Sequence, residues 1–316
     1  MSKFEHFDHD MLWIDGGQFH MGSDRHYADE RPVRQVKVDG FWMDKSTVTN
    51  DEFAEFVRET GYVTVAEKRP DPADFPGVDP FLLVAGSMVF HMTKGPVDLR
   101  DMRHWWDFIA GACWKHPEGA KSSLQGRGAH PVVQVAFEDA KAYAEWAGKD
   151  LPTEAEWEFA ARGGLEGAEF VWGDELAPAG KIMAKTWQGD FPWRNKAKKK
   201  LHRTAPVGSY PPNGYGLNDM TGNVWQWTTD WYVDRHPEKT PESCCALDNP
   251  RGAARHHSFD PQQPNVKIPR KVVKGGSFLC APSYCRRYRP AARHAQMVDS
   301  GMSHIGFRCI KRPQPT

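Results

Sequence analysis

Two cysteines near the C-terminal end of the chain are the residues best suited to carry chemistry. Cys280 and Cys285 stand five positions apart, after a glycine pair and before four arginines that end at Arg293. Nearby guanidinium groups favour a thiolate over a thiol, so we expect lowered cysteine pKa values and nucleophilic, oxidisable or metal-binding sulfurs. Pro282 excludes a helix between the two cysteines, and a loop can bring both sulfurs to one point.

The spacing of the two cysteines does not by itself decide between a metal site and ordinary buried thiols, which are the more common case. A four-thiolate zinc site is disfavoured, because no Cys-x-x-Cys pair occurs among Cys113, Cys244, Cys245 and Cys309. Two thiolates without imidazole or carboxylate companions suit the soft ion Cu(I) better than any hard ion.

Alternating apolar and polar residues predict the strands that must support this segment. Residues 16–22 and residues 33–43 both alternate, and together they predict two strands joined by a turn. Residues 130–135 also have the pattern of a strand. The chain contains 28 glycines and 24 prolines, which interrupt the periodic segments so often that long elements must be scarce.

Capping signals and periodicity predict three short helices. The first begins at a capping box with Thr49 and Glu52, followed by apolar residues on one helical face. The second covers residues 138–147, where an apolar stripe repeats at helical spacing. The third opens at a capping box formed by Thr153 and Glu156 and stops at a pair of glycines.

The remaining segments are typical of solvated or covering loops, and they comprise residues 71–128, 194–203 and 237–269. No tandem repeat or linker is visible in the sequence. We therefore expect one α+β domain of low regular secondary structure over residues 12–312, with short tails at residues 1–11 and 313–316.

Charge and hydropathy exclude several classes of partner. The 41 basic and 41 acidic residues cancel, so no global field attracts nucleic acid or an anionic membrane. Apolar runs such as residues 81–85 fall far short of the roughly 18 residues that span a bilayer. The N-terminal residues lack the apolar core of a secretory signal, and the six cysteines are too few to form a disulfide skeleton, so we expect a cytoplasmic protein.

Short motifs along almost the whole chain resemble those of the formylglycine-generating enzymes, the sulfatase-modifying factors. They occur in the family's order, at residues 16–23, 48–50, 60–67, 116–119, 146–149, 151–158, 161–164, 213–217, 222–225 and 306–308. The most specific is Gly-Gly-Ser-x-x-Cys-x-x-x-x-Cys-x-Arg-Tyr-Arg-x-Ala-Ala-Arg, which this chain matches from Gly275 to Arg293.

The resemblance implies the formylglycine-generating-enzyme fold, which is C-type-lectin-like, and an oxidase activity. Enzymes of this family convert a cysteine in a Cys-x-Pro-x-Arg segment of an unfolded sulfatase to formylglycine, with O₂, Cu(I) and a thiol reductant. Two alternatives remain open: a related copper oxidase acting on a different thiol, and a noncatalytic binding module on the same scaffold.

The family's site residues can be carried onto matching positions of this chain. Cys280 and Cys285 would be the copper ligands, with room for a substrate thiolate as a third soft ligand. Ser277 matches the active-site serine, and Trp225 matches the tryptophan that lines the pocket. Both also have ordinary roles open to them, as a turn serine and a core tryptophan.

Substrate contacts are expected from Tyr284, Arg287 and His304. His304 stands where the family has Asn, and Asp150 stands where the family has Arg, so both departures bear on the choice of substrate.

The resemblance also implies two structural calcium sites, of which this chain retains residues for one. That site would use hard oxygen ligands from Asp219, Gly222, Val224 and Gln226, although the family usually has Glu at the position of Gln226. Lys185 and Lys199 occupy ligand positions of the other site, which we predict to be absent because an ammonium cannot bind a cation. Pro290, Ala144 and Ala161 replace the disulfide partners of secreted relatives, which leaves Cys309 unpaired and fits a cytoplasmic protein.

Overall fold

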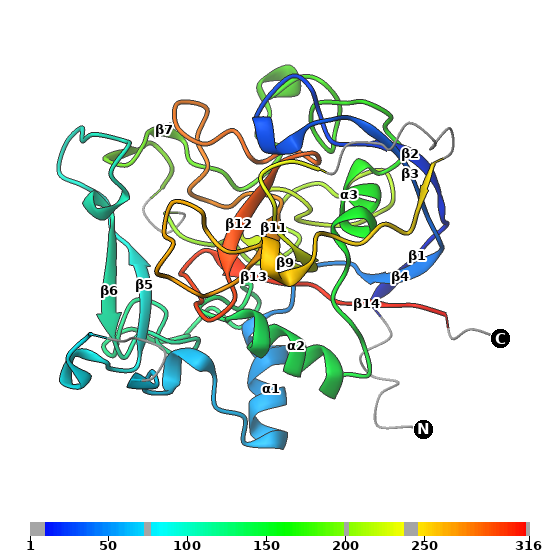
Figure 1. Cartoon of the computed structure of the whole chain (residues 1–316). Coiled ribbons are helices and arrows are strands. Elements are labelled where there is room, and N and C mark those ends of the chain that lie inside the picture. The colour runs from blue at the N-terminus through cyan, green and yellow to red at the C-terminus, as the bar shows by residue number, and fades with distance from the viewer. Residues whose placement is uncertain (1–9, 73–76, 199–201, 237–245, 314–316) are drawn as a thin grey trace.

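The computed structural model describes residues 10–72, 77–198, 202–236 and 246–313. Near the middle of the molecule lies a four-stranded sheet of order β12-β11-β9-β13 (Figure 1). Its strands are β9 (Trp225–Trp231), β11 (Arg270–Lys274), β12 (Arg293–Met297) and β13 (Ile305–Gly306). β11 pairs antiparallel with both β9 and β12, whereas β13 pairs parallel with β9.

Smaller sheets flank the central one on two sides (Figure 1). One three-stranded sheet joins β1 (Met11–Ile14), β4 (Phe41–Asp44) and β14 (Ile310–Lys311), and so unites both ends of the described chain. Another joins β2 (Gly17–Met21), β3 (Arg34–Val38) and β10 (Leu247–Asp248). The hairpin of β5 (Gly86–Phe90) and β6 (Trp106–Ala110) stands on the opposite side, and β7 (Gly189–Asp190) pairs with β8 (Arg194–Asn195).

The three helices form where the sequence predicts them. α1 (Asn50–Thr60) and α3 (Glu154–Arg162) begin at the capping boxes of Thr49 and Thr153, and each ends at a glycine in the left-handed conformation. α2 (Phe137–Trp146) lies beside α1, below the central sheet in Figure 1. α3 packs against β9 and β11 on one side and against β2 and β3 on the other.

Apolar side chains form two clusters that share α3 as a neighbour. The larger one joins α1 and α2 to the central sheet through residues such as Phe53, Tyr143 and Trp227. The other lies between α3 and the β2–β3 strands and includes Phe19 and Trp157. Burying each such side chain contributes ~1.5–3 kcal/mol, so these clusters hold the sheets together without long helices.

Four expectations about individual elements differ from the structure, and two of the differences have an identifiable reason. The segment 33–43 is two strands, because the chain turns at Asp39 and Gly40 and β4 joins a different sheet from β3. Residues 130–135 do not form a strand, because Gln134 has a left-handed φ of 62° and the backbone bonds of this segment go to separate loops. The β5–β6 hairpin lies within the segment expected to be loops, and β1 begins at Met11, inside the expected tail.

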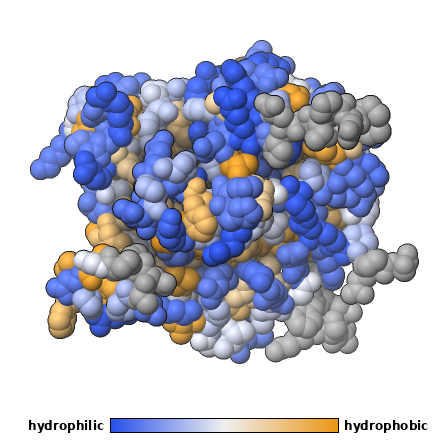
Figure 2. Space-filling model, viewed as in Figure 1, coloured by the Kyte–Doolittle hydropathy of each residue, from blue (hydrophilic) through white to orange (hydrophobic). Residues whose placement is uncertain are grey.

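The predicted fold class is confirmed: this is an α+β chain with few helices and many short strands and loops. The face shown in Figure 2 is largely hydrophilic, with apolar residues in scattered patches. Among the described residues, no helix has the length and apolar character to cross a bilayer. Cys244, Cys245 and Lys199 lie outside the described residues.

Candidate active site

The cysteine segment lies at one end of the central sheet, where all four strands contribute. In the strand register, Lys274 at the end of β11 pairs with Gln226 near the start of β9 and with Arg293 at the start of β12. Ile305, which begins β13, pairs with Trp225. Segments far apart in the sequence therefore converge at this end, and residues of β9, β11 and β12 line one cavity.

Two consecutive glycines turn the chain out of β11 and toward the cysteines. Gly275 and Gly276 have φ values of 92° and 70°, a region that other residues rarely adopt. A Cβ on Gly275 would lie 2.8 Å from the carbonyl oxygen of Met220. The glycine pair is thus a steric requirement of the turn that places Ser277 and Cys280.

The two sulfur atoms meet as the sequence predicts. Cys280 Sγ lies 3.1 Å from Cys285 Sγ, and neither cysteine is in a disulfide. Backbone N–H groups of Tyr284 and Cys285 donate to the carbonyl of Ala281, which closes the loop between the cysteines. Cys280 is buried, whereas Cys285 is partly exposed. An approaching molecule therefore meets Cys285 first.

The two thiols differ in acidity. A hydrogen bond from Cys280 lowers the pKa of Cys285, with smaller help from Arg287 and Arg289. Burial raises the pKa of Cys280 well above its usual value. The expected lowering therefore holds for Cys285 and is wrong for Cys280, where loss of water outweighs the nearby cations. The pair shares a proton in an S–H···S contact and exposes its more acidic member.

The four arginines after the cysteines do not act as free positive charges, because each has a carboxylate partner. Arg286 lies 3.5 Å from Glu169, and Arg287 lies 2.8 Å from Asp29. Arg289 and Arg293 are buried and make two-pronged ion pairs with Glu30 and Glu154. These pairs tie the cysteine loop to α3 and to residues near the N-terminus, and their carboxylates offset part of the positive charge near the sulfurs.

All of the predicted catalytic and substrate-binding residues line one cavity of about 610 Å³. They are Cys280, Cys285, Ser277, Trp225, Tyr284, Arg287 and His304. The Ser277 backbone N–H donates to Cys280 Sγ over 3.4 Å, and its hydroxyl accepts from the N–H of Leu279. Trp225 is 4% exposed and forms an apolar wall whose ring faces His294 at 5.5 Å between centroids.

An aromatic group at the cavity was missed by sequence reasoning. The ring of Tyr284 stacks on Phe191 at 4.3 Å with an interplanar angle of 5°, and the edge of Trp105 meets Tyr284 at 5.5 Å. Phe191 and Trp105 lie in loops without periodicity, so nothing in the local sequence relates them to the cysteines. Together the three rings form an apolar platform beside Cys285, in which Tyr284 and Phe191 are parallel and Trp105 is nearly perpendicular to both.

His304 enters the cavity as a neutral imidazole. Burial lowers its pKa to about 3, and its ring packs against Trp106 with 4.7 Å between centroids. Its backbone carbonyl accepts from the N–H of Trp225 over 2.9 Å, which fixes the position of both residues. By contrast, Asp150 pairs with Arg312 and is not among the residues that line this cavity.

The donor set of the cavity fits a soft metal ion better than a hard one. Across the described residues, no cluster of three or more His, Cys, Asp or Glu side chains could hold a metal. The two cysteine sulfurs form a close pair of soft donors at this cavity, and Cys285 is partly exposed. Such a pair suits Cu(I), which tolerates few ligands and prefers thiolates.

Of the residues predicted to bind calcium, Gln226 has a side-chain oxygen that is already engaged within the protein. The side-chain oxygen of Gln226 accepts hydrogen bonds from Trp157 Nε1 at 2.8 Å and from Arg308 Nε at 2.7 Å, which uses both of its lone pairs. Its amide nitrogen donates to the carbonyl of Asp219. The two N–H donors fix this orientation of the amide, so Gln226 offers no oxygen to an ion.

The other residues of that set, Gly222 and Val224, lie beside Gln226 in the buried turn before β9. At the second calcium position, Lys185 is buried and burial lowers its pKa to about 8. Gly222 lies directly against Lys185, because a Cβ on Gly222 would be 2.6 Å from the Lys185 carbonyl. A buried amine therefore occupies this region.

Comparisons with known proteins agree with the motifs. The model of the sulfatase-modifying factor enzyme 1-like domain matches residues 2–313. The chain is 52% identical over 305 residues to the formylglycine-generating enzyme of Mycobacterium tuberculosis, covering 96% of this chain and 98% of that protein. It is 43% identical over 313 residues to the formylglycine-generating enzyme of Thermomonospora curvata, with 96% and 93% covered. The solved structure of PvdO from Pseudomonas aeruginosa shares the fold at a TM-score of 0.60 and 23% identity, covering 96% of this chain and 94% of that one.

Proposed function

The chain belongs to the sulfatase-modifying factor family, and from this membership we propose that it converts a cysteine of a sulfatase segment to formylglycine. The observation that carries the proposal is the reduced pair of Cys280 and Cys285, 3.1 Å apart, at the wall of a cavity large enough for a peptide. The finer parts of the proposal are a Cu(I) ion, O₂ as oxidant and a Cys-x-Pro-x-Arg substrate.

The overall chemistry sets what must reach the cavity. Turning a CH₂–SH group into an aldehyde, with loss of sulfide, removes two electrons from the substrate. Reduction of O₂, whose two atoms end in water and in the aldehyde, requires four electrons. A thiol reductant must therefore supply the two electrons that the substrate does not provide. The balanced reaction consumes the peptide thiol, O₂, two protons and two electrons, and it yields the aldehyde, hydrogen sulfide and water.

The two cysteines would hold the ion, Cys280 from the buried side and Cys285 from the cavity side. When bound there, Cu(I) supplies the one-electron chemistry that lets O₂ oxidise a thiol substrate. The lowered pKa of Cys285 favours a thiolate at the exposed position, and the Ser277 N–H donates to the sulfur of Cys280. The protein thus presents two sulfurs that are already close together and that would move apart to hold an ion between them.

The cavity walls would position the substrate and exclude water. Trp225 and the platform of Tyr284, Phe191 and Trp105 offer apolar surfaces to the peptide's proline and its neighbours. Arg287 is held by Asp29 and lies over the ring of Tyr27 at 4.0 Å, so it forms a fixed edge of the cavity. His304 stays neutral near pH 7 and can exchange hydrogen bonds with the substrate without adding charge.

One reconstitution experiment tests the proposal. The anaerobically purified protein is loaded with Cu(I) and given air, a thiol reductant and a Cys-x-Pro-x-Arg peptide, and mass spectrometry follows replacement of SH by aldehyde. We expect one Cu(I) per chain and conversion of the peptide. Both are lost in Cys280→Ser and in Cys285→Ser and retained in Cys113→Ser, a buried cysteine that does not line the cavity.

The possible failures of this experiment have different meanings. Copper uptake without peptide modification would support an oxidase that acts on another thiol. The presence of His304, where the family has Asn, favours this alternative. Absence of copper uptake by the unaltered protein would refute the oxidase and favour a noncatalytic module.

A further inference from the structure

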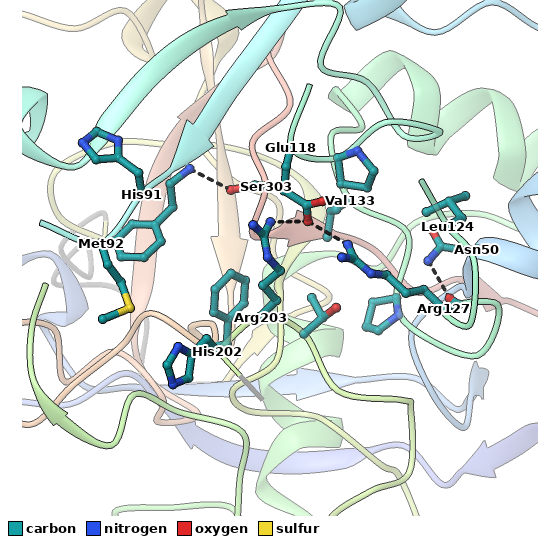
Figure 3. A pocket seen from close by; sticks show the side chains of 15 residues that line it. Asn50, His91, Met92, Glu118, Leu124, Arg127, Val133, His202, Arg203 and Ser303 are labelled. Atoms are coloured by element: carbon teal, nitrogen blue, oxygen red, sulfur yellow. Dashed lines mark hydrogen bonds and ion pairs between the residues drawn. The ribbon is translucent and has the colours of Figure 1, made fainter. Parts of the chain in front are cut away.

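A second cavity, of about 350 Å³, lies apart from the cysteine pair and plays no part in the proposed reaction. Its wall includes Asn50 at the start of α1, the end of β5 and two loops that carry Glu118, Arg127 and Arg203. Figure 3 shows both arginine side chains reaching toward Glu118 from different segments. The cavity is therefore built by loops that are distant in the sequence and meet on one carboxylate.

Two cations share a single anion in this cavity. Glu118 Oε1 accepts from Arg127 Nη1 at 2.7 Å and also pairs with Arg203 Nη1. Glu118 is the one carboxylate among the described residues that line the cavity. With the histidines neutral, the lining carries a net charge of +1, and no other lining side chain offsets it.

Both guanidinium groups keep most of their donors for another partner. A guanidinium has five N–H donors, and each of these arginines uses a single nitrogen on Glu118. Within the described part of the chain, neither side chain makes another hydrogen bond or ion pair. Burial lowers the pKa of both Arg127 and Arg203, because loss of water is not offset by their shared partner.

The rest of the lining is largely apolar. Phe90, Leu124, Val133 and Phe278 surround the polar group, and Pro117, Pro131 and Met92 extend the apolar wall. Pockets of roughly this volume, mostly apolar with a few convergent polar groups, are typical of small-molecule sites. A planar fork of N–H donors matches an oxyanion such as a carboxylate or phosphate.

We infer that this cavity binds a small organic anion, which places its carboxylate or phosphate on Arg127 and Arg203 and its apolar body against Phe90 and Phe278. Glu118 positions both arginines and keeps one positive charge in excess. The site borders the cysteine cavity, because Phe278 follows Ser277 in the chain and lining residue Ser303 precedes His304.

Calorimetric titration of the metal-free protein tests this site independently of copper and of peptide oxidation. The probes are benzoate, phenyl phosphate and the neutral benzamide, which share a phenyl body and differ in the polar group. The variant is Arg203→Gln, whose side chain is 49% exposed and can be replaced without disturbing the core. The control is Arg100→Gln, which removes a surface arginine paired with Asp98.

We expect saturable binding of benzoate or phenyl phosphate and none of benzamide, with affinity about tenfold weaker in Arg203→Gln and unchanged in Arg100→Gln. The stronger of the two anions identifies the carboxylate or the phosphate as the preferred group. The inference is refuted if neither anion binds at 10 mM, if benzamide binds equally well, or if Arg203→Gln binds like the unaltered protein.

Discussion

Breaking the buried ion pair between Arg289 and Glu30 should lower the stability of the protein by an amount that can be estimated, because this pair helps to hold the cysteine loop. Both carboxylate oxygens of Glu30 accept from Arg289, and the side chains are 0% and 2% exposed. In Glu30→Gln, an amide N–H replaces one acceptor and leaves a guanidinium buried without a counter-charge. Breaking a buried pair in this way costs about 3–5 kcal/mol of unfolding free energy.

The expected shift in melting temperature follows from the size of the chain. For 316 residues the unfolding entropy is about 0.66 kcal/mol/K, so the midpoint should fall by about 5–8 °C. Thermal unfolding followed by circular dichroism measures the shift. The matched control is Arg286→Gln, which removes a side chain that is 51% exposed and lies 3.5 Å from Glu169, and it should cost less than about 1 kcal/mol. If the two variants melt together, the arginines after the cysteines are not the ties described above.

Three further outcomes follow from the site. In the metal-free protein, Cys285 should react with iodoacetamide at a lower pH than an ordinary thiol. The pH at which alkylation is half-maximal should rise in Cys280→Ala, because this change removes the hydrogen bond that most lowers the pKa of Cys285. Peptide mapping of the alkylated protein measures this pH midpoint. Gly275→Ala should lower the free energy of unfolding by more than about 1 kcal/mol in urea titrations, because its φ of 92° and a backbone carbonyl 2.8 Å away exclude a methyl group. Calcium should leave the melting temperature of the unaltered protein unchanged but raise that of Gln226→Glu, where a carboxylate oxygen would face the carbonyl of Asp219 in place of an N–H donor.

Local signals in the sequence predict much of the fold. The capping boxes at Thr49 and Thr153 mark helix starts because the Thr–Glu pair satisfies backbone donors within four residues. The loop between the two cysteines is likewise local, since it contains Pro282 and is closed by the N–H groups of Tyr284 and Cys285, which donate to the carbonyl of Ala281. Both features can be identified without knowledge of any distant contact.

The acidity of the thiols could not be predicted from the sequence, because the largest effect on Cys280 is burial, which raises its pKa and is set by long-range packing. Adjacent arginines suggest a positive field, but Asp29 and Glu30, which neutralise two of them, lie more than 250 positions earlier. The availability of Gln226 for calcium also depends on distant residues: Trp157 and Arg308 donate to its side-chain oxygen, and neither is near it in sequence. The sequence motifs therefore predict which residue types form the site. Long-range packing determines the charge of these residues and whether their atoms are free to bind a ligand.

The ties between the cysteine loop and the N-terminal region also constrain when the centre can assemble. Arg287 and Arg289 reach back 258 and 259 positions to their acidic partners, so these ion pairs cannot form before both arginines have been synthesised. During translation, Asp29 and Glu30 therefore lack these partners until the segment with the two cysteines has left the ribosome. The thiol pair and the ion pairs that hold its loop thus assemble in the same step.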